Sequence, residues 1–364
     1  MTLILKASEL QTLADMPGTI AAVERVFAGL SRGTAIQPAP DSLLLPSSDA
    51  RFRPMAALSS AEELASVKLL ADIPANRESG LPTQRSTIML VSQLTGETLA
   101  ILDGKVPTRV RTAAASAVAT KLLARPGSTT LGLVGAGALA VAHVEAMLAV
   151  LPIENVVVWS RSADTVAAFC DQISHYGLNV TRADSVREVV EAADVLCTLT
   201  PAVEPVVRGE WFQPGLHVNA VGSRPRAAHR EIDSAGVVRA RVLGDRMATA
   251  GAQSGGRMIP GAGGVVGCGG GRGSRAELGR RGWSSLVLPG NDLLALGADS
   301  GRHRDRARSC GQRGQHPVPG RRRYRWRAGQ SSSGDGRIGA RATGRSRLRH
   351  GGRATVRTPV PALS

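Results

Sequence analysis

Residues 129–140 read TTLGLVGAGALA, and this stretch decides the fold of the middle of the chain. Its first half is an apolar run that predicts a buried strand, and Gly135 and Gly137 follow directly. With Ala140 they form the pattern G-x-G-x-x-A, in which the first glycine permits a tight turn and the second lets a pyrophosphate approach the backbone. The cofactor-binding residues predicted here are Gly135, Ala136, Gly137, Ala138 and Leu139.

The chain on the carboxyl side of this turn alternates between apolar runs and segments with helical spacing. Strands are expected at 155–160, 195–200 and 217–222, and helices at 143–150, 162–176 and 186–192. Such alternation is typical of a parallel sheet with helical crossovers. We therefore predict an α/β fold with a Rossmann-type dinucleotide-binding domain over residues 119–250.

Residues 1–118 predict a smaller α+β domain. We expect a strand at Leu3–Leu5, a helix whose apolar positions run from Ile20 to Leu30, and a hairpin around Thr95-Gly96. The Ala-rich stretch RTAAASAVATKLLARP, which begins at Arg111, predicts a helix with Thr112 as its N-cap. Arg111 would then lie at a helix N-terminus, where the guanidinium group and the helix dipole both favour a carboxylate.

The net charge of +16 is concentrated in the last part of the chain. Residues 251–364 hold 22 arginines, no lysine and five acidic residues, a net charge of +17, whereas residues 1–250 have a net charge of −1. Glycine, arginine, alanine and proline have GC-rich codons and lysine does not, so this composition is that of a GC-rich gene read out of frame. We interpret 251–364 as a disordered Arg/Gly-rich tail that follows a frameshift after about residue 250. A genuine disordered arm and a nucleic-acid-binding tail are the alternatives.

The end of the second expected strand bears on the choice of dinucleotide. Proteins that bind NAD often have an acidic residue there for the ribose 2′-hydroxyl, but this chain has Trp159-Ser160-Arg161. An arginine offers several donors to a 2′-phosphate. Ser160 and Arg161 therefore favour NADP over NAD, and a solvated Arg161 without a ligand is the alternative.

Several motifs before and after the glycine turn occur in a specific order. They are RFRPMAAL (51–58), SVKLLADIPANRESGLPT (66–83), TGETLAILDG (95–104), RTAAAS (111–116) and GLHVNAVGSRPRAAHREID (215–233). In this order and spacing, residues 1–250 resemble the ornithine cyclodeaminase/mu-crystallin family. The resemblance implies an enzyme of amino-acid metabolism that binds NAD or NADP and whose first domain, residues 1–118, binds the substrate and forms a homodimer. The lack of a signal-peptide core and of an apolar run long enough to span a membrane predicts a cytoplasmic protein. The four widely spaced cysteines predict no metal site.

The resemblance also implies roles for particular residues. Lys68, whose apolar chain neighbours suit a desolvated proton-transfer group, and Arg111 are the expected catalytic residues, which hold the substrate carboxylate beside the nicotinamide. The other expected substrate-binding residues are Arg51, Arg53, Thr83 and Arg224, and the further expected cofactor-binding residues are Thr200, Val221 and Gly222.

Two residues depart from the pattern of ornithine cyclodeaminases. Those enzymes have an acid/base aspartate two positions after the glycine that corresponds to Gly222, where this chain has Arg224. A permanent cation cannot shuttle protons, so the reduction of a small imino acid is favoured over cyclodeamination. Leu139 stands where the family usually has glutamine. A family member that binds NADP or a small ligand without turnover is a further alternative.

The expected helical region that returns to the first domain is missing after residue 250. Reading LGRRGWSSLVLPGNDLLALGA (278–298) one nucleotide later permits LADVVGRRSSSPE, which resembles the missing family segment. Without that region the first domain is expected to leave apolar surface uncovered and to fold only partially.

Overall fold

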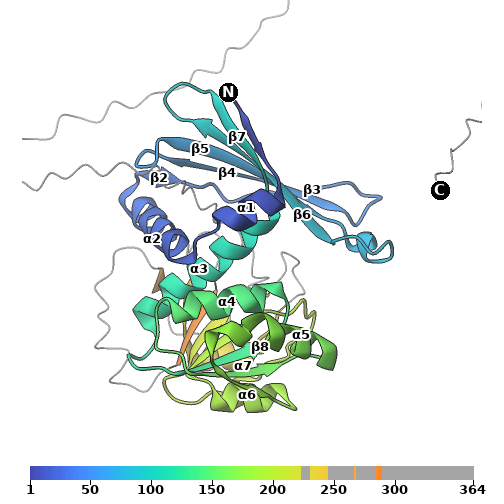
Figure 1. Ribbon diagram of the computed structural model, residues 1–364, viewed down its shortest axis with the longest axis vertical. Coiled ribbons are helices and arrows are strands. Elements are labelled where there is room, and N and C mark those ends of the chain that lie inside the picture. Colours follow the sequence, from blue (N-terminus) through green and yellow to red (C-terminus); the bar gives the residue numbers. More distant parts are fainter. Residues whose placement is uncertain (223–229, 245–265, 268–283, 289–364) are drawn as a thin grey trace, which may run out of the picture. The chain divides into compact units, whose positions relative to one another are not determined.

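The computed structural model describes residues 1–222, 230–244, 266–267 and 284–288. These residues form two sheets with their helices, and both sheets belong to one compact unit, Met1–Arg302 (Figure 1). The predicted boundary between residues 118 and 119 falls inside the helix α3 (Lys105–Leu123). The predicted α/β fold is confirmed.

The first sheet is mixed, and its strands follow the order β1-β7-β6-β5-β4-β2, with β3 beside β4. The strands are β1 (Leu3–Leu5), β2 (Ala35–Ile36), β3 (Leu43–Leu44), β4 (Arg51–Ser59), β5 (Leu64–Asp72), β6 (Gln84–Ser92) and β7 (Thr98–Asp103). The pair β1–β7 is parallel, and the other pairs are antiparallel. The expected hairpin around Thr95-Gly96 joins β6 to β7, and Gly96 adopts the left-handed conformation, with φ 75°, that glycine tolerates.

The long strands β4 and β5 were not expected from the sequence. Their side chains alternate between a buried inner face, which includes Arg53 and Lys68, and an exposed outer face. The inner face buries cations beside apolar residues such as Met55, and large apolar residues are exposed on the outer face, so these strands depart from the usual apolar-inside pattern. The exposed apolar residues of the outer face are Phe52, Leu58, Val67, Leu69 and Met89.

Three helices lie on one side of this sheet: α1 (Ala7–Leu13), α2 (Met16–Arg32) and α3 (Figure 1). The prediction that Thr112 caps α3 is wrong, because α3 begins at Lys105. Pro107 fits its first turn, where a missing N–H has no cost. The hydroxyl of Thr112 instead donates to the Thr108 carbonyl within the helix, at 2.6 Å. Arg111 consequently lies in the second turn of α3, not at the N-terminus.

The second sheet is parallel among the described residues, in the order β10-β9-β8-β11-β12-β15-β13-β14. Its first five strands are β8 (Thr130–Val134), β9 (Asn155–Trp159), β10 (Asn179–Arg182), β11 (Val195–Thr198) and β12 (His217–Ala220). The remaining strands are β13 (Ala240–Gly244), β14 (Val266–Gly267) and β15 (Ser284–Leu288). The helices are α4 (Ala138–Leu148), α5 (Ala163–Ile173), α6 (Val186–Ala192) and α7 (Ser234–Arg239). Apart from β14 and β15, the predicted out-of-frame tail lies outside the described residues.

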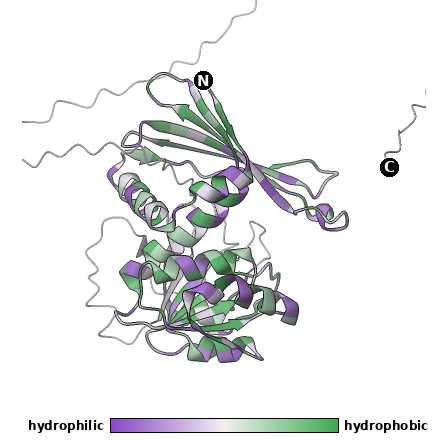
Figure 2. Ribbon diagram, in the orientation of Figure 1, coloured by the Kyte–Doolittle hydropathy of each residue, from purple (hydrophilic) through white to green (hydrophobic). Residues whose placement is uncertain are grey.

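The central strands β8, β11 and β12 are buried on both faces, as a Rossmann-type sheet requires. On one face, Leu131 and Leu133 pack with α4 and α5 in a cluster centred on Phe169. On the other face, Val134 and Leu196 pack with Val189 and Val190 of α6. Hydrophobic residues consequently continue across these strands (Figure 2).

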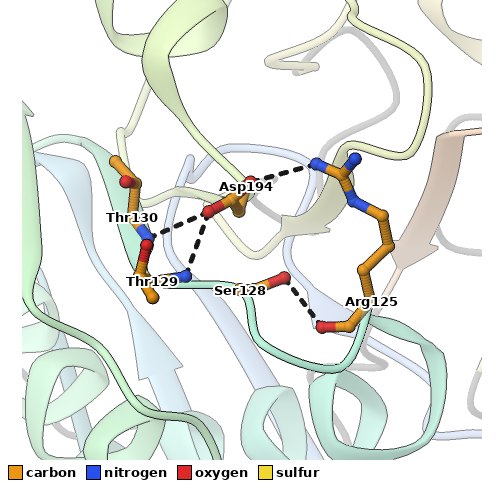
Figure 3. Close-up of polar contacts among 5 residues, drawn as sticks. All are labelled: Arg125, Ser128, Thr129, Thr130 and Asp194. Atoms are coloured by element: carbon orange, nitrogen blue, oxygen red, sulfur yellow. Dashed lines mark hydrogen bonds and ion pairs between the residues drawn. The ribbon is translucent and has the colours of Figure 1, made fainter.

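Asp194 organises the amino edge of the second sheet (Figure 3). Its Oδ2 accepts hydrogen bonds from the backbone N–H groups of Thr129 and Thr130, at 3.0 and 3.1 Å, and its Oδ1 accepts from Arg125 Nη2 at 3.0 Å. One carboxylate therefore connects the starts of β8 and β11 to the chain that leaves α3. This arrangement leaves the opposite, carboxyl edge of the sheet for a ligand.

Candidate active site

The turn after β8 has the conformation that its glycines predict. Gly135 has a φ of 110°, and a Cβ at this position would lie 3.0 Å from the carbonyl oxygen of Leu199. Its N–H donates to the Trp159 carbonyl at 2.8 Å. A side chain at Gly135 would therefore be both strained and crowded.

Gly137 is the N-cap of α4, and its surroundings are different. A Cβ at this position would meet no atom within 4 Å, so the backbone there faces open space. Ala140 is fully buried and lets α4 pack closely against β8. Open backbone before the N-terminus of an 11-residue helix fits the pyrophosphate of a dinucleotide.

The other predicted cofactor-binding residues follow neighbouring strands at the same edge. Ser160 and Arg161 follow β9, Thr200 follows β11, and Val221 and Gly222 follow β12. Arg161 is exposed and Ser160 is half-buried. The parallel order β9-β8-β11-β12 thus brings all of these predicted residues to the carboxyl edge.

Glu231, which the sequence analysis did not single out, ties two of these segments together. Its Oε1 accepts from the backbone N–H and the hydroxyl of Thr200, both at 2.7 Å. Its Oε2 accepts from the Thr198 hydroxyl at 2.6 Å and from the Gly222 N–H at 2.7 Å. Burial raises the pKa of Glu231, and these four donors oppose the rise.

The predicted substrate-binding cations lie on the inner face of the first sheet and on α3. We call Arg51, Arg53, Lys68 and Arg111 the basic cluster. Arg53, Lys68 and Arg111 are 4%, 2% and 6% exposed, and Arg51 is half-buried. Arg51 lies opposite Asp72, a buried carboxylate that also accepts from Gln84 Nε2 at 3.5 Å. Arginine and lysine side chains bind carboxylates, so a group of them at one place is suited to hold a substrate carboxylate.

Lys68 is hydrogen-bonded to the helix that carries Arg111, 43 positions further along the chain. Lys68 Nζ donates to Thr108 Oγ1 at 2.8 Å. Thr108 precedes Arg111 by three residues, so both lie on one face of α3. The structure therefore brings the two expected catalytic residues to the same part of the first domain. A helix predicted to begin at Lys105 would have placed Thr108 three residues before Arg111 on the same face, and so would have pointed to Thr108 from the sequence.

The two remaining predicted residues are placed differently. Thr83 is half-buried just before β6, and its carbonyl accepts from the Ile73 N–H at 2.8 Å. Arg224 lies outside the described residues.

A buried histidine links α3 to α4. His143 Nδ1 lies 2.7 Å from the Leu139 carbonyl oxygen, and its Nε2 lies 3.1 Å from Ser116 Oγ. The ring therefore donates to the carbonyl and accepts from the serine. Burial lowers the pKa of His143 to about 4. The predicted residue Leu139 thus contributes its carbonyl to an α3–α4 contact.

Within the described part of the chain, no three His, Cys, Asp or Glu residues are grouped as a metal site would require. A search of the described helices also finds none that is long and apolar enough to cross a membrane.

Solved structures with the same fold include enzymes that bind nicotinamide dinucleotides. The structure of Δ1-pyrroline-2-carboxylate reductase from Thermococcus litoralis, in complex with NADH and L-proline, has a TM-score of 0.70 and 30% identity, covering 81% of this chain and 93% of that one. An archaeal alanine dehydrogenase dimer with bound NAD has a TM-score of 0.69 and 28% identity, covering 81% and 92%.

Sequence relatives point to the same group of proteins. The ketimine reductase mu-crystallin of Mus musculus is 36% identical over 208 residues, which are 57% of this chain and 65% of that protein. The chain thus spans just under two thirds of this relative's length. The Δ1-pyrroline-2-carboxylate reductase of Bacillus cereus is 33% identical over 239 residues, which are 65% and 73% of the two chains. The family pattern itself matches residues 1–259, and the chain belongs to the ornithine cyclodeaminase/mu-crystallin family.

Proposed function

We propose that this protein reduces a small imino acid, a ketimine or a pyrroline or piperideine carboxylate, to the corresponding amino acid with NADPH or NADH. The observation that carries this proposal is the basic cluster, which brings four cations, three of them buried, to the inner face of the first sheet and to α3. Relatives named ketimine reductase and pyrroline-2-carboxylate reductase support it. When bound, the nicotinamide supplies the hydride for the C=N bond.

The residues of the chain would bind and orient the substrate. Arg111 offers a planar pair of donors to the carboxylate, with help from Arg51 and Arg53. Lys68 carries protons at Nζ and holds the same carboxylate or the imine nitrogen, which must gain a proton as the imine carbon gains hydride. Thr83 and Arg224 are the proposed outer contacts of the substrate.

The glycine turn and the neighbouring strand ends would hold the dinucleotide. Gly135, Ala136, Gly137, Ala138 and Leu139 would face the pyrophosphate, and Thr200, Val221 and Gly222 would border the nicotinamide half. We propose a preference for NADPH, because Arg161 is exposed immediately after β9, where a 2′-phosphate is recognised.

We further propose that two copies of the chain pair through the outer face of the first sheet. Five large apolar residues, Phe52, Leu58, Val67, Leu69 and Met89, are 37–45% exposed on that face. Exposed apolar surface of this kind marks an interaction site. The archaeal alanine dehydrogenase that shares the fold is itself a dimer.

The C-terminal segment 251–364 is, in our proposal, read out of frame. Sequencing the gene from the codon of Asp245 to the stop codon tests this directly. A single-base change that restores the missing family segment would support it, and an intact frame would overturn it. With an intact frame, cooperative thermal unfolding with bound NADPH would contradict the expectation of partial folding.

The assay for the proposed function follows NADPH consumption by the full 364-residue chain with Δ1-piperideine-2-carboxylate and Δ1-pyrroline-2-carboxylate. Net oxidation of NADPH with either imine supports the proposal. Ammonia release from ornithine without net redox change would assign the protein as a cyclodeaminase. Bound nucleotide with no turnover would assign a binding protein. Nucleic-acid binding that falls steeply with salt and requires residues 251–364 would identify a nucleic-acid tail.

A further inference from the structure

Glu231 is buried where β11 and β12 end, and among the described residues its side chain accepts hydrogen bonds from the segments that end or follow these strands. Its side chain accepts two bonds from Thr200, one from Thr198 and one from Gly222, at 2.6–2.7 Å. The residue is only 1% exposed. Charge-assisted bonds of this length are the strong ones, so the carboxylate holds both segments in one arrangement.

The segments after β11 and β12 are packed so closely that a side chain at Gly222 would not fit. A Cβ on Gly222 would lie 2.2 Å from the Thr200 carbonyl oxygen and 2.5 Å from Glu231 Oε1. Neither atom belongs to a flexible surface side chain, so the backbone itself would have to shift. Glu231 therefore holds the two segments together through its hydrogen bonds, and the absence of a side chain at Gly222 allows them to lie this close.

The hydrogen bonds change what Thr200 and Gly222 can do for a ligand. Their N–H groups, and the Thr200 hydroxyl, already donate to Glu231. These two residues would thus contribute the shape of the crevice, with their amide donors occupied inside the protein. The shape of the crevice thus depends on the Glu231 carboxylate, which is buried and would not itself contact the ligand.

We propose that Glu231 is a positioning residue, which sets the conformation of the segments after β11 and β12 and thereby the affinity for the dinucleotide. This inference rests on the proposed function in one respect, namely that the ligand at this edge is a nicotinamide dinucleotide. The positioning itself is testable in the protein without any nucleotide.

The first measurement is amide hydrogen exchange of the full-length chain without ligand, followed by mass spectrometry. In Glu231→Gln, an amide NH2 group replaces one carboxylate oxygen and cannot accept the two hydrogen bonds that this oxygen accepts. We expect peptides containing Thr200 and Gly222 to exchange at least about tenfold faster, while peptides from β8 and α4 stay unchanged. Unchanged exchange at both residues would overturn the proposal, whatever the protein binds.

The second measurement is the dissociation constant for NADPH and for NADH, from nucleotide fluorescence. Thr198 is fully buried and its hydroxyl donates to Glu231, so Thr198→Val removes this bond without removing a surface group that the nucleotide could contact. We expect about tenfold weaker binding in Thr198→Val and recovery in Thr198→Ser, which restores the hydroxyl. Faster exchange without weaker binding would overturn the link to the ligand.

A matched control separates positioning from general stability. Asp233, two residues further on, accepts from the N–H groups of Gly209 and Gly236 at 2.9 and 2.8 Å and contacts neither strand end in the bonds described. Asp233→Ala should lower the melting temperature and leave the dissociation constants unchanged. If Asp233→Ala weakens nucleotide binding as much as Thr198→Val, the special role of Glu231 is excluded. If the unmodified chain binds neither nucleotide, the proposed function fails while the exchange result still decides the positioning.

Discussion

The Lys68 ammonium donates to the Thr108 hydroxyl at 2.8 Å, which joins the inner face of the first sheet to α3. We expect Lys68→Met to lower kcat/KM for the imine by about 100-fold or more, because a proton-bearing group at the substrate is lost. Thr108→Val should cost about tenfold, since Lys68 loses one fixed partner. Neither change should alter the dissociation constant for NADPH.

Lys105→Met is the matched control for Lys68→Met, because Lys105 is an exposed lysine at the start of the same helix. It should retain full activity. Reduction of the imine by Lys68→Met at the unmodified rate would exclude a catalytic role for Lys68.

The sequence predicts the centre of the second sheet well, because β8, β9, β11 and β12 and the helices α4, α5 and α6 carry local apolar patterns. Such patterns do not predict β10, β13, β14, β15 and α7. The turn at Gly135 is predicted by the pattern G-x-G-x-x-A between a strand and a helix, which is typical of dinucleotide-binding turns. The first sheet is harder to predict, because β5 buries a lysine and exposes Val67 and Leu69, the reverse of the usual strand pattern. Burial of Lys68 is a property of the sheet and α3 together, and its apolar chain neighbours point to the opposite face.

Glu231 shows why part of the candidate site could not be predicted. In the sequence it stands in the polar stretch HREID, which has the composition of a solvated loop. Its burial depends on the ends of β11 and β12, which are 33 and 11 residues away along the chain and meet only in the parallel sheet. Long-range pairing of this kind leaves no local periodic pattern.

Asp194 is expected to be a main determinant of stability at the amino edge of the second sheet. Its bond to Arg125 is half-exposed and would contribute at most about 1 kcal/mol. The two backbone N–H groups of Thr129 and Thr130 weigh more, because Asp194→Ala leaves both without this acceptor. We expect urea unfolding to show a loss of about 2–3 kcal/mol.

Arg125→Ala should cost less than Asp194→Ala in the same experiment, and Asp171→Ala, at an exposed position of α5, should change stability by less than about 0.5 kcal/mol. Equal losses for Arg125→Ala and Asp194→Ala would show that the ion pair, and not the backbone bonds, dominates.

Arg161 is expected to decide between NADPH and NADH. Arg161→Glu removes a donor for the 2′-phosphate and places a carboxylate where it can accept from a ribose hydroxyl. The dissociation constant for NADPH should rise by about 10- to 100-fold, while that for NADH stays equal or falls. Arg187→Glu, on α6, is the control of equal charge change and should leave the ratio of the two constants unaltered. An unchanged ratio in Arg161→Glu would assign Arg161 to the solvated surface.

The outer face of the first sheet is expected to be a dimer interface. Val67 and Leu69 are adjacent outward positions of β5, 40% and 45% exposed. The double change Val67→Glu, Leu69→Glu should convert a dimer into a monomer in sedimentation, because like charges would be buried without partners. Leu94→Glu, at the β6–β7 turn and 70% exposed, should leave the oligomeric state unchanged. A monomeric unmodified chain would contradict the proposed interface.

Acid should destabilise the protein through His143 and His217, because burial lowers the pKa of each from 6.5 to about 4. Above pH 6.5 both histidines are neutral in the folded and the unfolded chain, so they add no pH dependence. As the pH falls below 6.5, the unfolded chain binds protons that the folded chain excludes, and the free energy of unfolding decreases until about pH 4. Between pH 7.5 and pH 5, each histidine should cost about 2 kcal/mol.

Urea unfolding at the two pH values measures this loss. His143→Gln should remove about half of the histidine contribution. Ser116→Ala, which removes the ring's partner but leaves its titration, should lower stability at both pH values by similar amounts. An acid-induced loss that is the same in His143→Gln as in the unmodified chain would show that His143 is not held neutral between α3 and α4.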